Sequence, residues 1–366
     1  MDITIGQITD YLEGIAPPSL QESYDNSRLI VGDKNTIVKG VITALDCIED
    51  VVDEAISKGF NLIVAHHPIV FGGLKSFNGK NYIERTVIKA IKNDIAIYAI
   101  HTNLDNVLHG VNGVWADHLG LTNQTVLSPK NELYKKLCVF IPEDHFEDVS
   151  KAIFNAGAGK IGKYDECGFS TQGQGSFRPL IGSNPFQGKQ GVKEVVKEIK
   201  FECLVPGFAV AKVLKAMNLA HPYEEVAYDL YDVSATSMEI GSGVYGELEE
   251  PMDSMEFLKM LKSKMKTGCV KYTRPINDKI QKIAICGGSG SFLLNAAKAS
   301  GADIFITSDY KYHQFFDAEN DIMIADIGHF ESEHLTINYL AEIIKEKFTT
   351  FAVLKTDVIT NPVNYL

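Results

Sequence analysis

Three separate segments of the chain combine histidines with carboxylates. The residues are His66 and His67, His101 and Asp105, and His329 and Glu333. In the second and third segments the carboxylate follows the histidine by four residues. Imidazole and carboxylate ligands without sulfur suit Zn²⁺, Fe²⁺ or Mn²⁺. We interpret the three segments as parts of one metal site, and the two adjacent histidines, which leave a strand in different directions, could serve two neighbouring ions.

Each of these segments follows an apolar run that predicts a buried strand. The runs cover residues 61–65, 95–100 and 322–325. In open α/β sheets, ligands bind beyond the carboxyl ends of the strands. If a helix begins at the turn after such a strand, a histidine and a carboxylate four residues apart lie on the same face. A single buried histidine is more often a core residue than a ligand, so the interpretation depends on the joint occurrence of the three segments.

The same residues allow more specific hypotheses. A carboxylate that bridges two ions about 4 Å apart would help to activate water and clamp a reacting oxygen. We assign Glu333 this bridging role because His329 and Glu333 come as a unit. Asp309 and His313 follow another predicted strand, 303–307, and could supply a general acid or base; the alternative is a pair on a surface loop. His101 either binds an ion or forms a hydrogen bond that orients a residue bound to the ion.

The element pattern predicts an α/β fold with a discontinuous core. Residues 1–130 alternate strand and helix patterns and predict a first core lobe with a mostly parallel sheet. Residues 131–235 read as an inserted ferredoxin-like α+β domain, because their predicted order is strand, helix, strand, strand, helix, strand. Residues 236–366 return to the α/β pattern and predict a second, similar lobe.

Composition excludes several classes of protein. The chain has 366 residues and a formal net charge of −12, which weighs against a general nucleic-acid binder. No apolar run is long enough to span a bilayer, and the N-terminal segment lacks the pattern of a signal peptide. The six cysteines are scattered singly, which suits a reducing compartment and argues against a thiolate zinc site. We therefore expect a cytoplasmic protein that does not bind membranes.

Four motifs resemble those of the Nif-three-like family, whose members are often named GTP cyclohydrolase I type 2 homologues. The motifs are VAHHPIVF at 64–71, HTNLD at 101–105, GADIFITSD at 301–309 with KYH at 311–313, and GHFESE at 328–333. The resemblance covers essentially the whole chain. It implies a dinuclear site whose ligands fall on His66, His67, Asp105, His329 and Glu333. One departure is Ser308, where many relatives carry glycine, and it lies outside this ligand set.

The resemblance also implies a toroidal homohexamer with the metal sites facing an internal cavity, and a PII/CutA-like identity for the insertion. We expect two divalent ions per chain, with zinc as the first choice and iron or manganese as alternatives. Authentic GTP cyclohydrolase I uses thiolates at its zinc site, whereas here no cysteine accompanies a ligand motif.

The expected function is therefore metal-dependent hydrolysis of a small molecule, either a phosphoester, a nucleotide or a cyclic amide. The alternative is a metal-binding regulatory or chaperone-like hexamer without catalysis. Two further motifs are assigned mainly structural roles. The glycine-rich loop 287–290 predicts a tight turn more than a phosphate cradle, and the segment 221–225 predicts a structural or oligomer contact.

Overall fold

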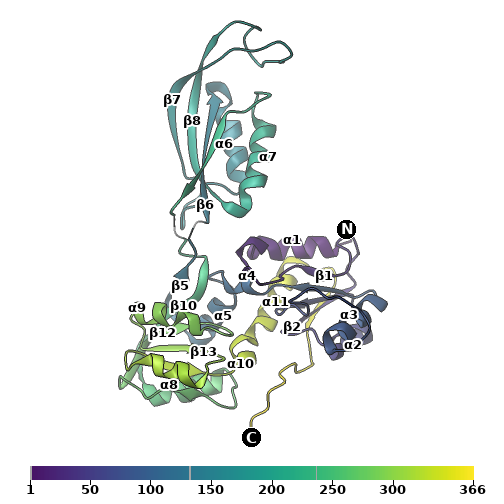
Figure 1. Cartoon of the computed structure of the whole chain (residues 1–366), viewed down its shortest axis with the longest axis vertical. Coiled ribbons are helices and arrows are strands. Elements are labelled where there is room, and N and C mark those ends of the chain that lie inside the picture. Colours follow the sequence, from purple (N-terminus) through teal and green to yellow (C-terminus); the bar gives the residue numbers. More distant parts are fainter. Residues whose placement is uncertain (1, 132, 236) are drawn as a thin grey trace. The chain divides into compact units, whose positions relative to one another are not determined.

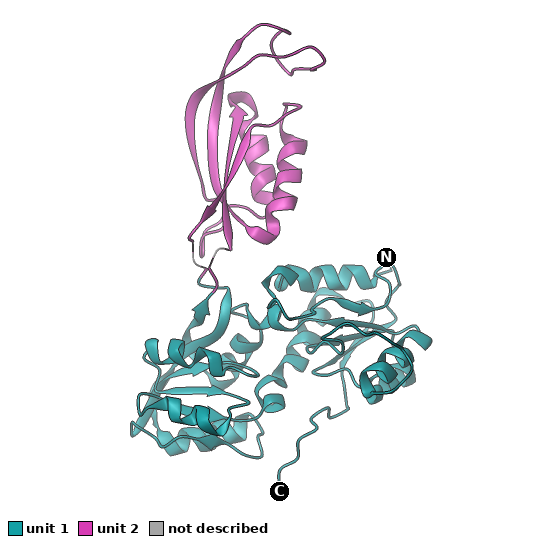
Figure 2. Ribbon diagram, in the orientation of Figure 1, with its two compact units in different colours: residues 1–129, 238–366 teal, residues 130–237 magenta. Residues whose placement is uncertain are grey.

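The computed structural model describes residues 2–131, 133–235 and 237–366. The chain forms two compact units (Figure 2). Unit 1 combines the residues up to Pro129 with those from Met238 onward, and unit 2 is formed by Lys130–Ser237. Unit 1 is therefore discontinuous in sequence.

The first sheet of unit 1 has five strands in the order β1-β4-β3-β2-β15. Its strands are β1 (Leu29–Val31), β2 (Gly40–Ala44), β3 (Leu62–Ala65), β4 (Ala96–Ala99) and β15 (Ala352–Lys355). All neighbours are parallel except β1, which runs antiparallel to β4. The carboxyl ends of β2, β3 and β4 consequently meet at one edge.

The second sheet of unit 1 has six strands in the order β11-β14-β13-β12-β10-β5. Its strands are β5 (Thr122–Pro129), β10 (Gly241–Asp253), β11 (Lys271–Tyr272), β12 (Lys279–Ile285), β13 (Ile304–Thr307) and β14 (Met323–Asp326). The three central strands β12, β13 and β14 are parallel, and the outer strands are antiparallel. The carboxyl ends of β13 and β14 again lie side by side.

Helices cover both faces of each sheet, which explains why the central strands are buried along most of their length. The helices of unit 1 are α1 (Ile5–Ile15), α2 (Glu49–Lys58), α3 (Tyr82–Lys92), α4 (Thr102–Asp105), α5 (Val111–Leu119), α8 (Ser254–Lys264), α9 (Leu294–Ala299), α10 (His329–Glu333) and α11 (Leu335–Lys347), with 3-10 turns η1 (Pro18–Leu20), η4 (Ser291–Leu293) and η5 (Tyr312–Ala318). In the first sheet, α1 and α11 pack on one face and α2 and α3 on the other. In the second sheet, α5 and α8 pack on one face and α9 on the other.

Each sheet of unit 1 is built from both parts of its sequence, the part before unit 2 and the part after it (Figure 1). Strand β15 joins the first sheet beside β2, although it lies close to the C-terminus. Strand β5 pairs with β10 in the second sheet, and helix α5 packs against that sheet, although both elements precede unit 2 in the sequence. Both segments of unit 1 therefore contribute to the core of each sheet.

Unit 2 is an antiparallel sheet with two helices. Its strands are β6 (Tyr134–Pro142), β7 (Gly168–Phe177), β8 (Glu194–Pro206) and β9 (Tyr228–Val233), and its helices are α6 (Phe146–Asn155) and α7 (Val210–Ala220), with 3-10 turns η2 (Glu143–His145) and η3 (Gly207–Ala209). The sheet order is β7-β8-β6-β9. Both helices share one apolar core with alternate residues of β6 and β8.

The structure confirms a mixed α/β fold with several sheets. The helices within the described ranges are all too short or too polar to traverse a lipid bilayer.

Candidate metal centre

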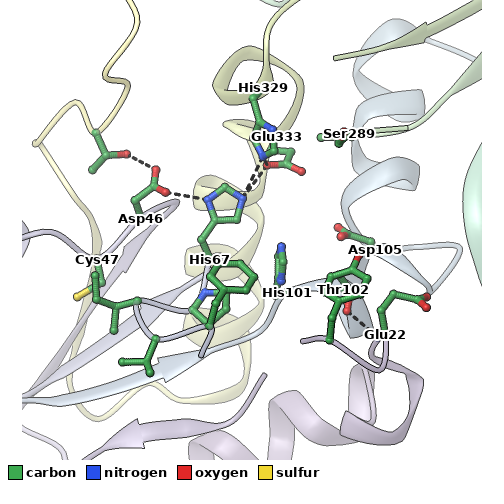
Figure 3. Close-up of a pocket in the computed structure, with 18 of the residues that line it drawn as sticks. Glu22, Asp46, Cys47, His67, His101, Thr102, Asp105, Ser289, His329 and Glu333 are labelled. Atoms are coloured by element: carbon green, nitrogen blue, oxygen red, sulfur yellow. Dashed lines mark hydrogen bonds and ion pairs between the residues drawn. The ribbon is translucent and has the colours of Figure 1, made fainter. Parts of the chain in front are cut away.

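Strand ends from both sheets of unit 1 bring the predicted histidines and carboxylates together. His66 and His67 directly follow β3, and His101 follows the neighbouring β4 after one residue. From the second sheet, β14 leads into the short helix α10, which begins at His329 and ends at Glu333. Figure 3 shows side chains from these segments gathered around one space, with Asp105 from the end of α4 among them.

Glu333 occupies the centre of this group. Its Oε2 atom lies 2.9 Å from Nε2 of His67 and 3.1 Å from Nε2 of His329. Its Oε1 atom faces Nε2 of His66 at 3.9 Å, and that nitrogen lies 3.6 Å from Oδ1 of Asp105. The two carboxylate oxygens thus face two different sets of donor atoms.

The donor atoms form three overlapping groups that could hold a metal ion. In each group, one donor atom per residue lies within 4.8 Å of the others. The groups are His67 with His329 and Glu333, His66 with Asp105 and Glu333, and His66 with His67 and His101. His101 therefore presents its ring to the same space as the other histidines. No cysteine belongs to these groups in the described ranges.

Two buried polar atoms in the centre have no hydrogen-bond partner among the described residues. They are Nε2 of His66 and Oδ1 of Asp105. A buried polar atom without a partner costs free energy, on the order of 1–3 kcal/mol. A bound cation would satisfy both atoms, because each is a good ligand for a divalent ion. The residues present therefore fit a metal site.

Each imidazole is held at Nδ1 by a partner outside the group, which leaves Nε2 directed inward. His66 donates its Nδ1 proton to the carbonyl oxygen of Ile100 at 2.9 Å. The other three rings donate to carboxylates: His67 to Asp46 at 2.8 Å, His101 to Asp25 at 2.8 Å and His329 to Asp309 at 2.6 Å. Such partners fix the tautomer and raise the basicity of metal-binding histidines.

Burial and hydrogen bonding shift the pKa values of three of these imidazoles in opposite directions. Burial lowers the pKa of His66 to about 3, so that its ring is neutral near pH 7. For His67, burial acts against the charged form, but hydrogen bonds to Asp46 and Glu333 raise the pKa to about 10. Hydrogen bonds to Asp309 and Glu333 likewise outweigh burial and raise the pKa of His329 to about 11.

The two central carboxylates also differ. Burial and the negative charge of Glu333 raise the pKa of Asp105 well above its ordinary value. Burial acts in the same direction on Glu333, but the hydrogen bonds from His329 and His67 hold the pKa of Glu333 well below its ordinary value. The carboxylates thus favour protons on His67 and His329, and a divalent ion would take the place of such protons.

The centre opens into a cavity of about 1060 Å³ in unit 1. Its wall includes residues of the segment 67–74, the loop 286–289 and the C-terminal segment 359–362. The glycine at 288 has φ of +63°, and a Cβ atom there would lie 2.4 Å from Oε1 of Glu333. This loop therefore needs glycine because its backbone passes so close to the carboxylate.

The structure brings together all six residues of the three predicted segments, but it separates His313 from them. His313 is exposed on η5, where its ring lies beside Tyr312 and Phe316. Asp309 instead contacts the centre, as the hydrogen-bond acceptor of His329.

The sequence patterns did not identify two outer carboxylates. Asp46 lies two residues beyond β2, at the same sheet edge, and this strand-end position was a signal that could have identified it. Asp25 lies in the irregular segment before β1, where no pattern marks it.

Comparisons with known proteins identify the family of the chain. The family described as Duf34/NIF3 (NGG1p interacting factor 3) matches residues 3–362. A protein of Halalkalibacterium halodurans named GTP cyclohydrolase 1 type 2 homolog is 39% identical over 100% of both chains. The chain belongs to the Duf34/NIF3 family, which confirms the resemblance seen in its motifs.

Two solved structures share the whole fold. The crystal structure of a Bacillus cereus protein related to NIF3 has a TM-score of 0.87 and 37% identity, and covers 100% of both chains. A Staphylococcus aureus protein has a TM-score of 0.79 and 31% identity, covering 100% of this chain and 99% of its own.

Proposed function

We propose that the chain is a dinuclear metal-dependent hydrolase that acts on a small molecule, either a phosphoester, a nucleotide or a cyclic amide. The observation that carries this proposal is the placement of Glu333, whose two carboxylate oxygens face two different sets of donor atoms. A carboxylate in that position suits a bridge between two ions.

The ligands divide into two sets around this bridge. His67 and His329 would hold one ion with Oε2 of Glu333, and His66 and Asp105 would hold the other with Oε1. His101 lies beside both adjacent histidines and is available to either ion. The donor set suits zinc, iron and manganese alike, and we propose zinc as the first choice among them.

When bound, two such ions would polarise the substrate and clamp the attacking and leaving oxygens of a displacement. The chain's own residues orient the ligands for that task. Asp46 and Asp309 hold the Nδ1 protons of His67 and His329, so that each Nε2 faces the centre. We therefore assign Asp309 to positioning His329, in place of the acid–base role predicted from its spacing to His313.

Relatives carry the name GTP cyclohydrolase 1 type 2 homolog. We propose hydrolysis at a histidine and carboxylate site rather than the GTP ring opening that this name suggests, because none of the possible ligand groups in the described ranges contains a cysteine.

The test is a hydrolysis screen of zinc-loaded protein against phosphomonoesters, phosphodiesters, nucleotides and cyclic amides. We expect turnover that is lost in His67→Ala and retained in Asp144→Asn, which alters an exposed carboxylate outside the cavity lining. Two bound ions with no turnover on any of these classes would instead favour the non-catalytic regulatory or chaperone-like assembly.

We also propose that unit 2 is an inserted ferredoxin-like domain of the PII/CutA type, and that the chain assembles into a homohexameric toroid in the cytoplasm. The strand and helix order of unit 2, together with the sheet order β7-β8-β6-β9, supports the ferredoxin-like assignment. Size-exclusion chromatography with light scattering tests the assembly. We expect a mass near that of six chains, and a monomer at micromolar concentration would contradict the hexamer.

A further inference from the structure

The cavity beside the metal centre is lined by carboxylates but by no lysine or arginine of the described ranges. Its acidic lining residues are Glu22, Asp46, Glu49, Asp50, Asp105 and Glu333. Arg85 pairs with Glu49 at 2.7 Å but does not itself line the cavity. An anion that enters this cavity therefore meets no lysine or arginine from the described chain.

Two bound divalent ions would supply the main positive charge of this cavity. The carboxylates of the lining would offset much of that charge, because no lysine or arginine of the described ranges lies among them. Like charges repel, so each further negative charge on a ligand makes its binding less favourable. A polyphosphate would bring several negative charges to this lining, whereas a neutral or singly charged compound would not.

The cavity is also lined by exposed aromatic side chains. Tyr24, Phe71, Tyr82 and Phe292 all line the cavity, and each is between 52% and 69% exposed. The ring of Phe71 meets that of His101 edge to face, with 5.5 Å between centroids, so one aromatic surface begins directly beside the metal centre. Exposed aromatic faces next to a polar centre suit a flat ring, because stacking removes apolar surface from water.

We infer that this cavity takes a flat heterocyclic or aromatic compound that is uncharged or carries one negative charge, and that it disfavours nucleoside polyphosphates. The inference rests on the proposed metal-dependent function and narrows its substrate class. A ring-bearing cyclic amide and the phosphodiester of a nucleoside both meet the two requirements, and GTP meets only one. Phe71 is assigned the ring contact nearest to the ions.

Three probes separate the contributions of ring and charge. Cyclic guanosine 3′,5′-monophosphate has a flat ring and one negative charge, GTP has the same ring with several charges, and dimethyl phosphate has the single charge without a ring. Titration calorimetry on zinc-loaded protein should show the cyclic nucleotide binding about tenfold more tightly than either other probe. Metal content measured after each titration shows whether GTP has removed the ions.

Variants of two exposed phenylalanines complete the test. Phe71→Leu should weaken the cyclic nucleotide about tenfold and leave dimethyl phosphate unchanged. Phe77→Leu is the matched control, because Phe77 is similarly exposed in the same connection between β3 and α3 but does not line the cavity. Tighter binding of GTP than of the cyclic nucleotide, with two ions retained, would overturn the inference and leave the proposed hydrolase intact. Protein that cannot be loaded with metal would instead overturn the proposed function.

Discussion

Oε2 of Glu333 lies 2.9 Å from Nε2 of His67, although the two residues are 266 positions apart in the sequence. His67 follows a strand of the first sheet, and Glu333 ends the short helix that follows a strand of the second sheet. The contact therefore joins the carboxyl ends of both sheets at one centre. The candidate metal site therefore depends on the correct folding of both sheets of unit 1.

Glu333→Gln should lower the metal content from about two ions to at most one per chain. The amide offers only one good ligand oxygen and cannot balance the charge of two cations. Elemental mass spectrometry of the purified variant measures this directly. Glu331→Gln is a suitable control, because this neighbouring carboxylate is also buried but belongs to none of the possible ligand groups. Full occupancy by two ions in Glu333→Gln would rule out the bridging role.

Asp46→Asn and Asp309→Asn should each weaken metal affinity by about 10- to 100-fold. Each carboxylate accepts the Nδ1 proton of a histidine, so the variant loses the charge that orients the ring and raises its basicity. Competition with a chromogenic chelator gives the affinity. Asp144→Asn serves as the comparison, because this exposed carboxylate lies outside the cavity lining. Equal affinities for all four proteins, including the wild type, would show that these hydrogen bonds do not tune the site.

The histidine-bearing strand ends could be predicted from the sequence because each signal is local. An apolar run followed at once by His66 and His67, or by His329 and Glu333 at helical spacing, marks both the strand and its chemistry. Asp25 carries no such local signal, because only the folded chain brings it to within hydrogen-bonding distance of His101. His313 has the right spacing from Asp309 but lies on an exposed turn, since spacing alone does not decide which way a loop faces.

The sequence patterns also could not predict which strands pair within each sheet. Strand β15 pairs with β2 in parallel, although one strand lies near each end of the chain. Apolar periodicity identifies each strand but not its neighbour, because pairing depends on contacts between distant segments.

Gly288→Ala should reduce both the stability and the metal content of unit 1. The positive φ alone costs an alanine about 1 kcal/mol, and the new Cβ would also lie 2.4 Å from Oε1 of Glu333. Gly301→Ala isolates the backbone contribution, since Gly301 has φ of +74° and a Cβ atom there would meet nothing within 4 Å. Thermal unfolding and metal analysis should show a larger loss of stability and of metal for Gly288→Ala than for Gly301→Ala. Equal losses in the two variants would exclude a steric effect of the new Cβ on Glu333.

Unit 2 should lose stability as the pH falls below about 6.5. Nε2 of His221 donates to the carbonyl oxygen of Phe140, and its Nδ1 accepts the backbone N–H of Tyr223, so the neutral ring is the one that fits. Burial lowers the pKa of His221 in the folded unit. The unfolded chain then binds more protons than the folded one. The neutral His221 therefore makes its full contribution to the stability of unit 2 above the pKa of histidine in the unfolded chain, and this contribution declines as the pH falls below that pKa.

Hydrogen exchange across residues 134–233 at pH 7.5 and 5.5 measures this effect, after correction for the intrinsic exchange rates. His221→Gln is the control, because glutamine keeps donor and acceptor groups but does not titrate. Protection of unit 2 in the native protein that does not fall between the two pH values would contradict the assignment.

Metal content per chain tests the central claim most directly. It should be measured by elemental mass spectrometry on protein purified without affinity tags or chelators. We expect a ratio near two, which falls in His67→Ala and in Asp105→Ala. A ratio near zero that added Zn²⁺, Fe²⁺ or Mn²⁺ cannot raise would contradict the dinuclear site, and the histidines at the strand ends would then have only structural roles.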